Sequence, residues 1–231
     1  MFGDRPRWLT FDCYGTLIQW DQGLLAAMDR ILASKEQRVD RDAFIAAYDR
    51  LEHAMEMQRP HRTFREIASR ALIEAMAEFS LSANHEDAEI LTRSIGQMPP
   101  FPEVVPTLER LKNAGFKIAV ISNTDDAIIS GNISQLGGTI DRVITAEQAG
   151  AYKPSARIFE YAWSALGAGK EELVHICASP QLDLLAAREL AFRAIWVDRG
   201  KGRALPSDYT PVATVSKLDE VWTVLRESGW I

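Results

Sequence analysis

The residues best suited to chemistry stand in the segment Leu9–Leu17, where a short apolar run ends at a carboxylate. Asp12 is followed by Tyr14, Gly15 and Thr16. A carboxylate at the end of a strand, presented on a glycine turn, can act as a nucleophile. Taken alone, the same aspartate could merely cap the turn that follows it.

Three further loops carry charged or small polar residues where a purely structural turn needs none. They are Ser122-Asn123, Lys153-Pro154 and Ser179 to Asp183. The ammonium of Lys153 would hold a nearby carboxylate ionised and oriented. Ser122, Asn123 and Thr16 could donate hydrogen bonds to a departing anion. Asp183 could activate water, hold Lys153 in place, or bind a cation together with the first aspartate.

Each of these groups also has a structural interpretation. Ser122-Asn123 could begin a helix, Lys-Pro is commonly a solvated loop, and Asp183 could interact with a helix dipole. Their placement favours chemistry, because each group follows a predicted strand. The carboxyl ends of parallel strands meet at one edge of a sheet, where ligands bind.

The elements that must position these residues alternate between strand and helix patterns. This alternation indicates an α/β fold with a Rossmann-like parallel sheet covered on both faces. The predicted strands are Arg7–Phe11, Phe116–Ile121, Arg142–Thr145, Leu173–Ala178, Ala194–Val197 and Val212–Val215. The predicted helices after the insert are Pro102–Asn113, Ser155–Leu166, Leu182–Phe192 and a last helix with Ser216 as its N-cap.

One region breaks the alternation, because residues 21–96 show only helical patterns. Thr63 to Glu66 reads as a capping box, and another helix is expected to begin near Asn84. The proline-rich stretch Met98–Pro102 cannot continue a helix. We therefore expect an α/β core domain, residues 1–18 and 99–231, with an all-helical cap domain, residues 19–98, inserted after the first strand. Such an insert would act as a lid over the sheet edge.

The composition narrows the class of protein. The 231 residues suffice for a core domain with a smaller insert, and 47% apolar with 25% charged residues is typical of globular proteins. The net charge of −6 argues against nucleic acid as a partner, and no apolar run reaches the length of a membrane span. The charged segment Met1–Arg7 has no signal-peptide core, so the cytoplasm is the expected location. Cys13 and Cys177 are expected to be reduced, buried thiols.

The four motifs together resemble those of the haloacid dehalogenase superfamily, over essentially the whole chain. The sequence Asp12-x-Tyr14-Gly15-Thr16-Leu17 is similar to the L-2-haloacid dehalogenase branch, which works without a metal or other cofactor. The resemblance implies that Asp12 displaces halide from a short L-2-haloacid. Water would then hydrolyse the Asp12 ester, giving the 2-hydroxy acid with inverted configuration. The superfamily's magnesium-dependent phosphatases carry a second aspartate, a general acid, where this chain has Tyr14.

The resemblance also implies roles for single residues. Lys153 would steady Asp12, and Asp183 would assist the attacking water. The residues expected to contact a small carboxylic acid substrate are Tyr14, Thr16, Ser122, Asn123 and Ser179. The cap arginine of the haloacid enzymes is replaced here by Ala47, with Arg50 one turn along either as its substitute or on a solvated helix face. Phe159 and Pro180 are further departures, and a homodimer is expected from the resemblance alone.

Other functions stay open. A related branch opens the ring of L-azetidine-2-carboxylate, and the run Phe11–Ile18 with Trp20 is similar to it. Its leaving amine would need a proton, for which His53, Asp49 and Glu52 are possible sources. A magnesium-dependent phosphatase is disfavoured by Tyr14. A non-catalytic binding module is disfavoured because it has no need for Asp12, Lys153 and Asp183 together.

Overall fold

The computed structural model describes residues 3–33, 35 and 38–231. Met1 and Phe2, which begin the N-terminal segment considered above as a targeting signal, lie outside these residues. In the described part of the chain, no helix is both long and apolar enough to cross a membrane.

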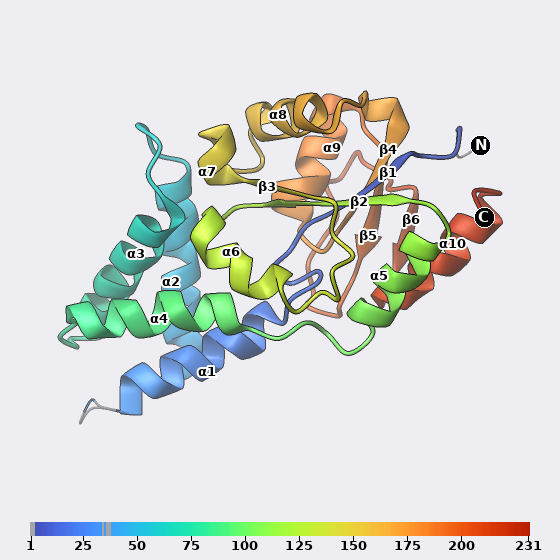
Figure 1. Cartoon of the computed structure of the whole chain (residues 1–231). Coiled ribbons are helices and arrows are strands. Elements are labelled where there is room, and N and C mark those ends of the chain that lie inside the picture. The colour runs from blue at the N-terminus through green and yellow to red at the C-terminus, as the bar shows by residue number, and fades with distance from the viewer. Residues whose placement is uncertain (1–2, 34, 36–37) are drawn as a thin grey trace.

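A six-stranded parallel sheet forms the centre of the protein, in the order β3-β2-β1-β4-β5-β6 (Figure 1). Each predicted strand is confirmed to within one residue at either end. The strands β1 and β4 are buried along their whole length, which explains their unbroken apolar runs. The strands are β1 (Trp8–Phe11), β2 (Lys117–Ser122), β3 (Arg142–Thr145), β4 (Leu173–Cys177), β5 (Ala194–Val197) and β6 (Ala213–Val215).

Helices cover both faces of this sheet (Figure 1). On one face lie α5 (Val104–Asn113) and α10 (Val221–Glu227), and on the other lie α8 (Ala156–Leu166) and α9 (Leu185–Leu190). Two short helices, α6 (Asp126–Ile133) and α7 (Ala146–Ala149), follow β2 and β3.

Two details of the predicted helices are wrong. The helix expected over Leu182–Phe192 is split into a π-helical turn, η2 (Pro180–Leu184), and α9, which ends where Ala191 adopts a left-handed φ of 56°. Ser216 is not an N-cap, because its hydroxyl donates to Glu220 and the 3-10 turn η3 (Leu218–Glu220) begins after Lys217.

Among the described residues, four helices lie between β1 and α5, and we call them the helical insert. They are α1 (Trp20–Ala33), α2 (Arg41–Glu56), α3 (Phe64–Glu78) and α4 (His85–Gln97). The capping box of Thr63 and Glu66 is confirmed, as is the start of α4 after the N-cap Asn84. The two segments that connect the insert to the sheet run side by side. Phe101 N donates to Leu17 O at 3.0 Å, and Gln19 N donates to Pro99 O at 2.9 Å.

The insert packs closely on the core at the crossing of α4 and α6. A Cβ added to Gly131 would lie 2.3 Å from the carbonyl oxygen of Gly96, so only glycine allows this approach. Asn132 on α6 also donates to the carbonyl oxygens of Ile95 and Met98, at 3.0 and 3.1 Å. These contacts hold the insert over the carboxyl edge of the sheet.

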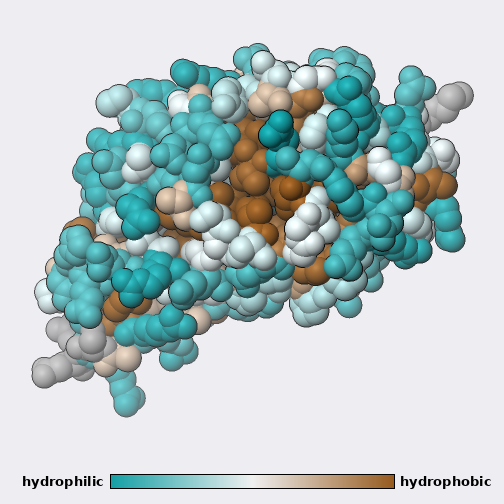
Figure 2. All heavy atoms as spheres, in the orientation of Figure 1, coloured by the Kyte–Doolittle hydropathy of each residue, from teal (hydrophilic) through white to brown (hydrophobic). Residues whose placement is uncertain are grey.

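The outer surface of the insert is mostly hydrophilic on the face that Figure 2 shows, while hydrophobic residues gather near the middle of the molecule, over the core. Large apolar side chains that are exposed lie singly along the chain, at Met57, Ile73, Tyr161 and Ile231. The homodimer stays a prediction.

Candidate active site

A small cavity, of about 110 Å³, lies between the carboxyl ends of the strands and helix α2. The core lines it with Asp12, Tyr14, Ser122, Asn123, Lys153, Ser179, Leu182 and Arg203. The helical insert lines it with Trp20, Asp21, Asp49, Glu52, His53, Glu56 and Phe64. Most of the residues that the sequence singled out therefore meet in one place.

The centre of the site is a buried lysine between two carboxylates. Lys153 Nζ donates to Asp12 Oδ1 at 2.7 Å, to Asp183 Oδ1 at 2.8 Å and to Ile121 O at 3.1 Å. All three ammonium protons therefore have acceptors. Asp12 lines the cavity, whereas Asp183 is fully buried and does not.

The electrostatics of this group favour the charged forms of Lys153 and Asp183. Burial alone would lower the pKa of Lys153, but the carboxylates of Asp12 and Asp183 outweigh it, so the pKa lies above its ordinary value. Burial would raise the pKa of Asp183, but the charge of Lys153 and the hydrogen bond from His175 hold it below its ordinary value. The ammonium and the Asp183 carboxylate thus stabilise each other.

Thr16 orients the nucleophile candidate and does not reach the cavity. Its hydroxyl donates to Asp12 Oδ2 at 2.7 Å and accepts from the backbone N–H of Ala178 at 2.9 Å. The expectation that Thr16 contacts substrate is corrected by this geometry, because its side chain is fully buried behind Asp12. Arg199 holds the same turn by donating to the carbonyl oxygens of Gly15 and Thr16, at 3.1 and 2.6 Å.

Ser122 and Asn123 end β2 at the cavity wall. The Ser122 side chain lines the cavity, and its buried hydroxyl has no hydrogen-bond partner in the described structure. The Asn123 amide is fixed by the backbone of Lys153, since Oδ1 accepts from Lys153 N at 2.7 Å. Its Nδ2 consequently faces Lys153 O and Glu56 Oε2, at 3.2 and 3.3 Å.

Tyr14 presents its ring and not its hydroxyl to the cavity. The hydroxyl donates to Asn132 Oδ1 at 2.9 Å, and the ring packs on Trp20 at a centroid distance of 5.2 Å. Burial raises the pKa of Tyr14 well above its ordinary value. Tyr14 therefore cannot replace the general acid that phosphatases of the superfamily carry at this position.

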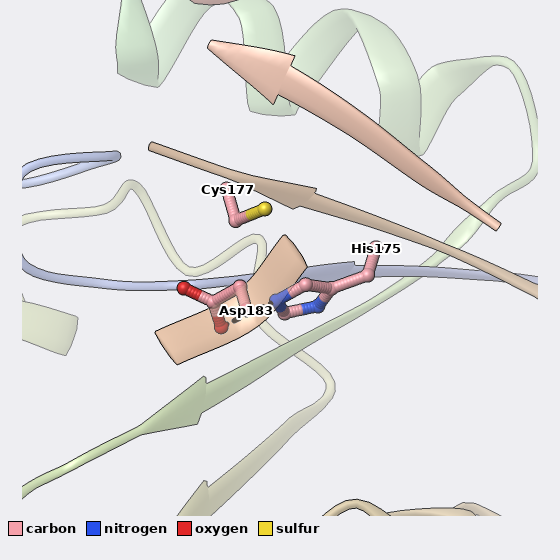
Figure 3. A group of neighbouring side chains, drawn as sticks. All are labelled: His175, Cys177 and Asp183. Carbon is pink, nitrogen blue, oxygen red and sulfur yellow. Dashed lines mark hydrogen bonds and ion pairs between the residues drawn. The ribbon is translucent and has the colours of Figure 1, made fainter. Parts of the chain in front are cut away.

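Figure 3 shows His175 of β4, a buried residue that the sequence did not single out, with its ring directed toward Asp183. The imidazole of His175 reaches Asp183 Oδ1 through Nε2 at 3.0 Å and Thr10 Oγ1 through Nδ1 at 2.9 Å. Because His175 lies inside the apolar run of β4, its position in the sequence did not indicate a functional role. Phe159, one of the departures noted above, packs edge-on against its ring at 5.8 Å.

Cys177 lies beside this pair, and one potential ligand atom from each of His175, Cys177 and Asp183 lies within 4.8 Å of the others (Figure 3). The donor set does not fit a metal ion. Burial raises the pKa of the Cys177 thiol well above its ordinary value, and Asp183 Oδ1 is committed to Lys153. Both Cys13 and Cys177 are free, buried thiols, as predicted.

Ser179 and Arg50 are the two remaining candidates from the sequence, and only Ser179 lines the cavity. Ser179 lines the cavity, and its hydroxyl accepts from Leu182 N at 3.3 Å. Arg50 does not line it, because both oxygens of Glu78 bind its Nη2 at 2.7 Å on an exposed face. The structure therefore corrects the expectation that Arg50 replaces the cap arginine. Arg203, from the loop after β5, lines the cavity instead.

Helix α2 brings an acidic face to the cavity. Asp49, Glu52 and Glu56 follow each other at spacings of three and four residues, so they lie on one side of the helix, together with His53. Asp49, Glu52 and His53 were predicted as possible proton sources, whereas Glu56 was missed. Glu52 and Glu56 are 4% and 5% exposed, respectively.

The chain belongs to the haloacid dehalogenase-like hydrolases, whose family model matches residues 6–190. It is 26% identical to (S)-2-haloacid dehalogenase 4A of Burkholderia cepacia, over 97% of both chains. It is 24% identical to the (S)-2-haloacid dehalogenase of Pseudomonas putida, over 96% of this chain and 95% of that one. The fold matches the L-2-haloacid dehalogenase from Xanthobacter autotrophicus with chloropropionic acid covalently bound, with a TM-score of 0.82 and 16% identity over 96% and 98% of the chains.

Proposed function

We propose that the protein hydrolyses the bond between a leaving group and the carbon next to a carboxylate, with Asp12 as the nucleophile. The observation that carries this proposal is the 2.7 Å contact between Lys153 Nζ and Asp12 Oδ1 at the wall of the cavity. A buried ammonium pairs with one oxygen of the Asp12 carboxylate, and Thr16 holds the other. An ionised carboxylate in a fixed orientation is what a displacement at carbon requires.

The first substrate class is the short L-2-haloacids. An oxygen of Asp12 attacks C2, and the carbon–halogen bond breaks with its electron pair on the halide. Water then attacks the carbonyl carbon of the Asp12 ester, which releases the 2-hydroxy acid with inverted configuration and restores the carboxylate. Halide needs no proton, in keeping with the position of the Tyr14 hydroxyl.

The surrounding residues supply binding. The unpartnered hydroxyl of Ser122 and the guanidinium of Arg203 suit the substrate carboxylate. Asp183 acts through Lys153, because it does not reach the cavity. The helical insert acts as a cap, with Phe64 of α3 closing the cavity. The similarity to two (S)-2-haloacid dehalogenases over nearly the whole chain supports this substrate class.

A second candidate is displacement of a non-halide group, with ring opening of L-azetidine-2-carboxylate as the example. The acidic face of α2 favours it, because a halide site has no need for these carboxyls beside the cavity. Burial raises the pKa of Glu56 to about 8, although the hydrogen bond from Asn123 opposes this. Glu56 is thus largely protonated at neutral pH, and by ionising it could face a substrate nitrogen that enters as an ammonium and leaves as a neutral amine.

The test is release of halide from (S)-2-chloropropionate in the presence of a chelator, with L-azetidine-2-carboxylate assayed in parallel. Halide release that survives the chelator supports the first candidate, and ring opening without halide release supports the second. Hydrolysis of a generic phosphate ester only after addition of magnesium would contradict both.

A further inference from the structure

The cap side of the cavity carries more acidic groups than its cations can pair. Asp12 is held by Lys153, and Asp21 pairs with Lys201 at 2.7 Å. The remaining charged side chains that line the cavity are the carboxyls of α2 and two basic groups. They are Asp49, Glu52 and Glu56, with His53 on the same helix and Arg203 from the core.

The carboxyls of α2 are buried with few opposing charges beside them. His53 Nδ1 lies 3.8 Å from Glu52 Oε2, and the charge of Arg203 lowers the pKa of Asp49 less than burial raises it. Burial, with the charges of Glu56 and Asp49, raises the pKa of Glu52 well above its ordinary value. Burial likewise raises the pKa of Asp49 to about 6. One oxygen of Asp49 is buried without a hydrogen-bond partner in the described structure. Buried carboxyls of this kind are stabilised when a cation enters beside them.

The opposite wall suits an anion. The Ser122 hydroxyl is fully buried, lines the same cavity and has no partner among the described residues. Arg203 adds a positive charge from the core. A small ligand with a carboxylate toward the core and a cationic group toward α2 would therefore satisfy both walls.

The geometry favours an organic cation over a bare metal ion. In the described part of the chain, only His175, Cys177 and Asp183 bring three potential ligand atoms within 4.8 Å of one another. The carboxyls of α2 are spread along two turns of helix and do not converge in that way. A protonated amine, with two or three N–H donors, can reach separated carboxylates.

We propose that Asp49, Glu52 and Glu56 form an ammonium subsite, so the substrates are zwitterions with a carboxylate and a protonated nitrogen near C2. This inference rests on the proposed function, since it assumes that the cavity beside Asp12 is the active site. It assigns the second candidate reaction its substrate class and makes α2 the element that selects substrates.

The experiment compares two ligands that the enzyme should not turn over. L-Proline and cyclopentanecarboxylate share an unstrained five-membered ring with a carboxylate, and only proline has a protonated ring nitrogen. Calorimetric titration in two buffers of different ionisation enthalpy gives both the affinity and the protons released. We expect proline to bind at least about tenfold more tightly, with proton release at neutral pH as Glu52 and Glu56 ionise.

The variant for this test is the double change Glu52→Gln and Glu56→Gln, which keeps the size of both side chains. It should abolish both the preference for proline and the proton release. Glu74→Gln, an exposed change on α3, should alter neither. Glu56→Gln alone, expected to weaken both effects, replaces the double variant if that variant does not fold.

Equal binding of the two ligands, tighter binding of cyclopentanecarboxylate, or no binding of either would overturn the proposal. These are binding measurements on ligands that are not substrates. Failure of the covalent mechanism would instead appear as a loss of turnover, so the two failures are distinguishable.

Discussion

Lys153 and Asp12 form an ion pair at 2.7 Å, with side chains that are 1% and 9% exposed. Replacing Lys153 by Met would leave Asp12 and Asp183 facing each other without a counter-charge. Removal of one partner from a buried pair costs about 3–5 kcal/mol. We expect a loss of stability of that order and a loss of activity, measured by denaturant unfolding and by substrate turnover.

The matched control is Lys201→Met. Lys201 also forms an ion pair at 2.7 Å, with Asp21, but the two side chains are 46% and 38% exposed. Exposed pairs contribute about 0–1 kcal/mol. A loss in Lys153→Met no larger than that in Lys201→Met would mean that the buried pair is not formed.

The pH dependence of stability should report on Glu56. Its pKa is about 8 in the folded protein and 4.5 ordinarily, so the folded state binds this proton more tightly than the unfolded state. The contribution of this proton to the free energy of unfolding is therefore fully present below about pH 4.5. It is lost as the pH rises toward about 8. Glu56→Gln should reduce this pH-dependent loss of unfolding free energy by a few kcal/mol, since each unit of pKa shift corresponds to roughly 1.4 kcal/mol. Unfolding measured across that range checks this, and an unchanged slope would contradict it.

Arg203 and Arg50 should differ in their effect on substrate binding. Arg203 lines the cavity, whereas Arg50 is bound to Glu78 on an exposed face. We expect Arg203→Met to raise KM at least about tenfold with a smaller change in kcat, because a charged contact to the substrate carboxylate is lost. Arg50→Met should leave both constants nearly unchanged. The reverse pattern would restore Arg50 as the substitute for the cap arginine.

Asp125 should control the placement of the cap. Its carboxylate accepts from the backbone N–H groups of Phe64 and Arg65, at 2.7 and 2.8 Å, which ties the start of α3 to the core. Asp125→Ala should speed amide exchange in residues 63–66 and raise KM several-fold, roughly as expected for loosening a cap. Asp126→Ala is the control, because Asp126 binds Thr145 and Gln148 within the core. Equal rates of amide exchange in residues 63–66 of the two variants would show that Asp125 does not hold the cap.

The order of elements could be predicted from the sequence because buried parallel strands give unbroken apolar runs. The strand ends then located Asp12, Ser122 and Asn123, and the Lys-Pro loop located Lys153. The structure places all four around one cavity. The direction of a side chain could not be predicted in this way. Thr16 therefore appeared as a substrate contact, although its hydroxyl is used to hold Asp12.

Arg203 and Glu56, which line the cavity, were missed for different reasons. Arg203 lies in a loop after β5, where no periodicity indicates which side chains turn inward. Glu56 did leave a signal, since Asp49, Glu52 and Glu56 repeat with helical spacing beside the apolar stripe of α2. Arg50 falls on the same helix, but its rotation about the axis takes it away from this face, toward Glu78.

The central claim is that an oxygen of Asp12 itself bonds to the substrate. Single turnover in labelled water, with enzyme in excess over substrate, tests it most directly. We predict unlabelled oxygen in the first hydroxy-acid product and label in the Asp12 carboxylate, found by mass spectrometry of its peptide. Asp12→Asn, folded but without turnover, serves as the control. Label in the first product with none in Asp12 would contradict the account, because water would then have attacked the substrate directly.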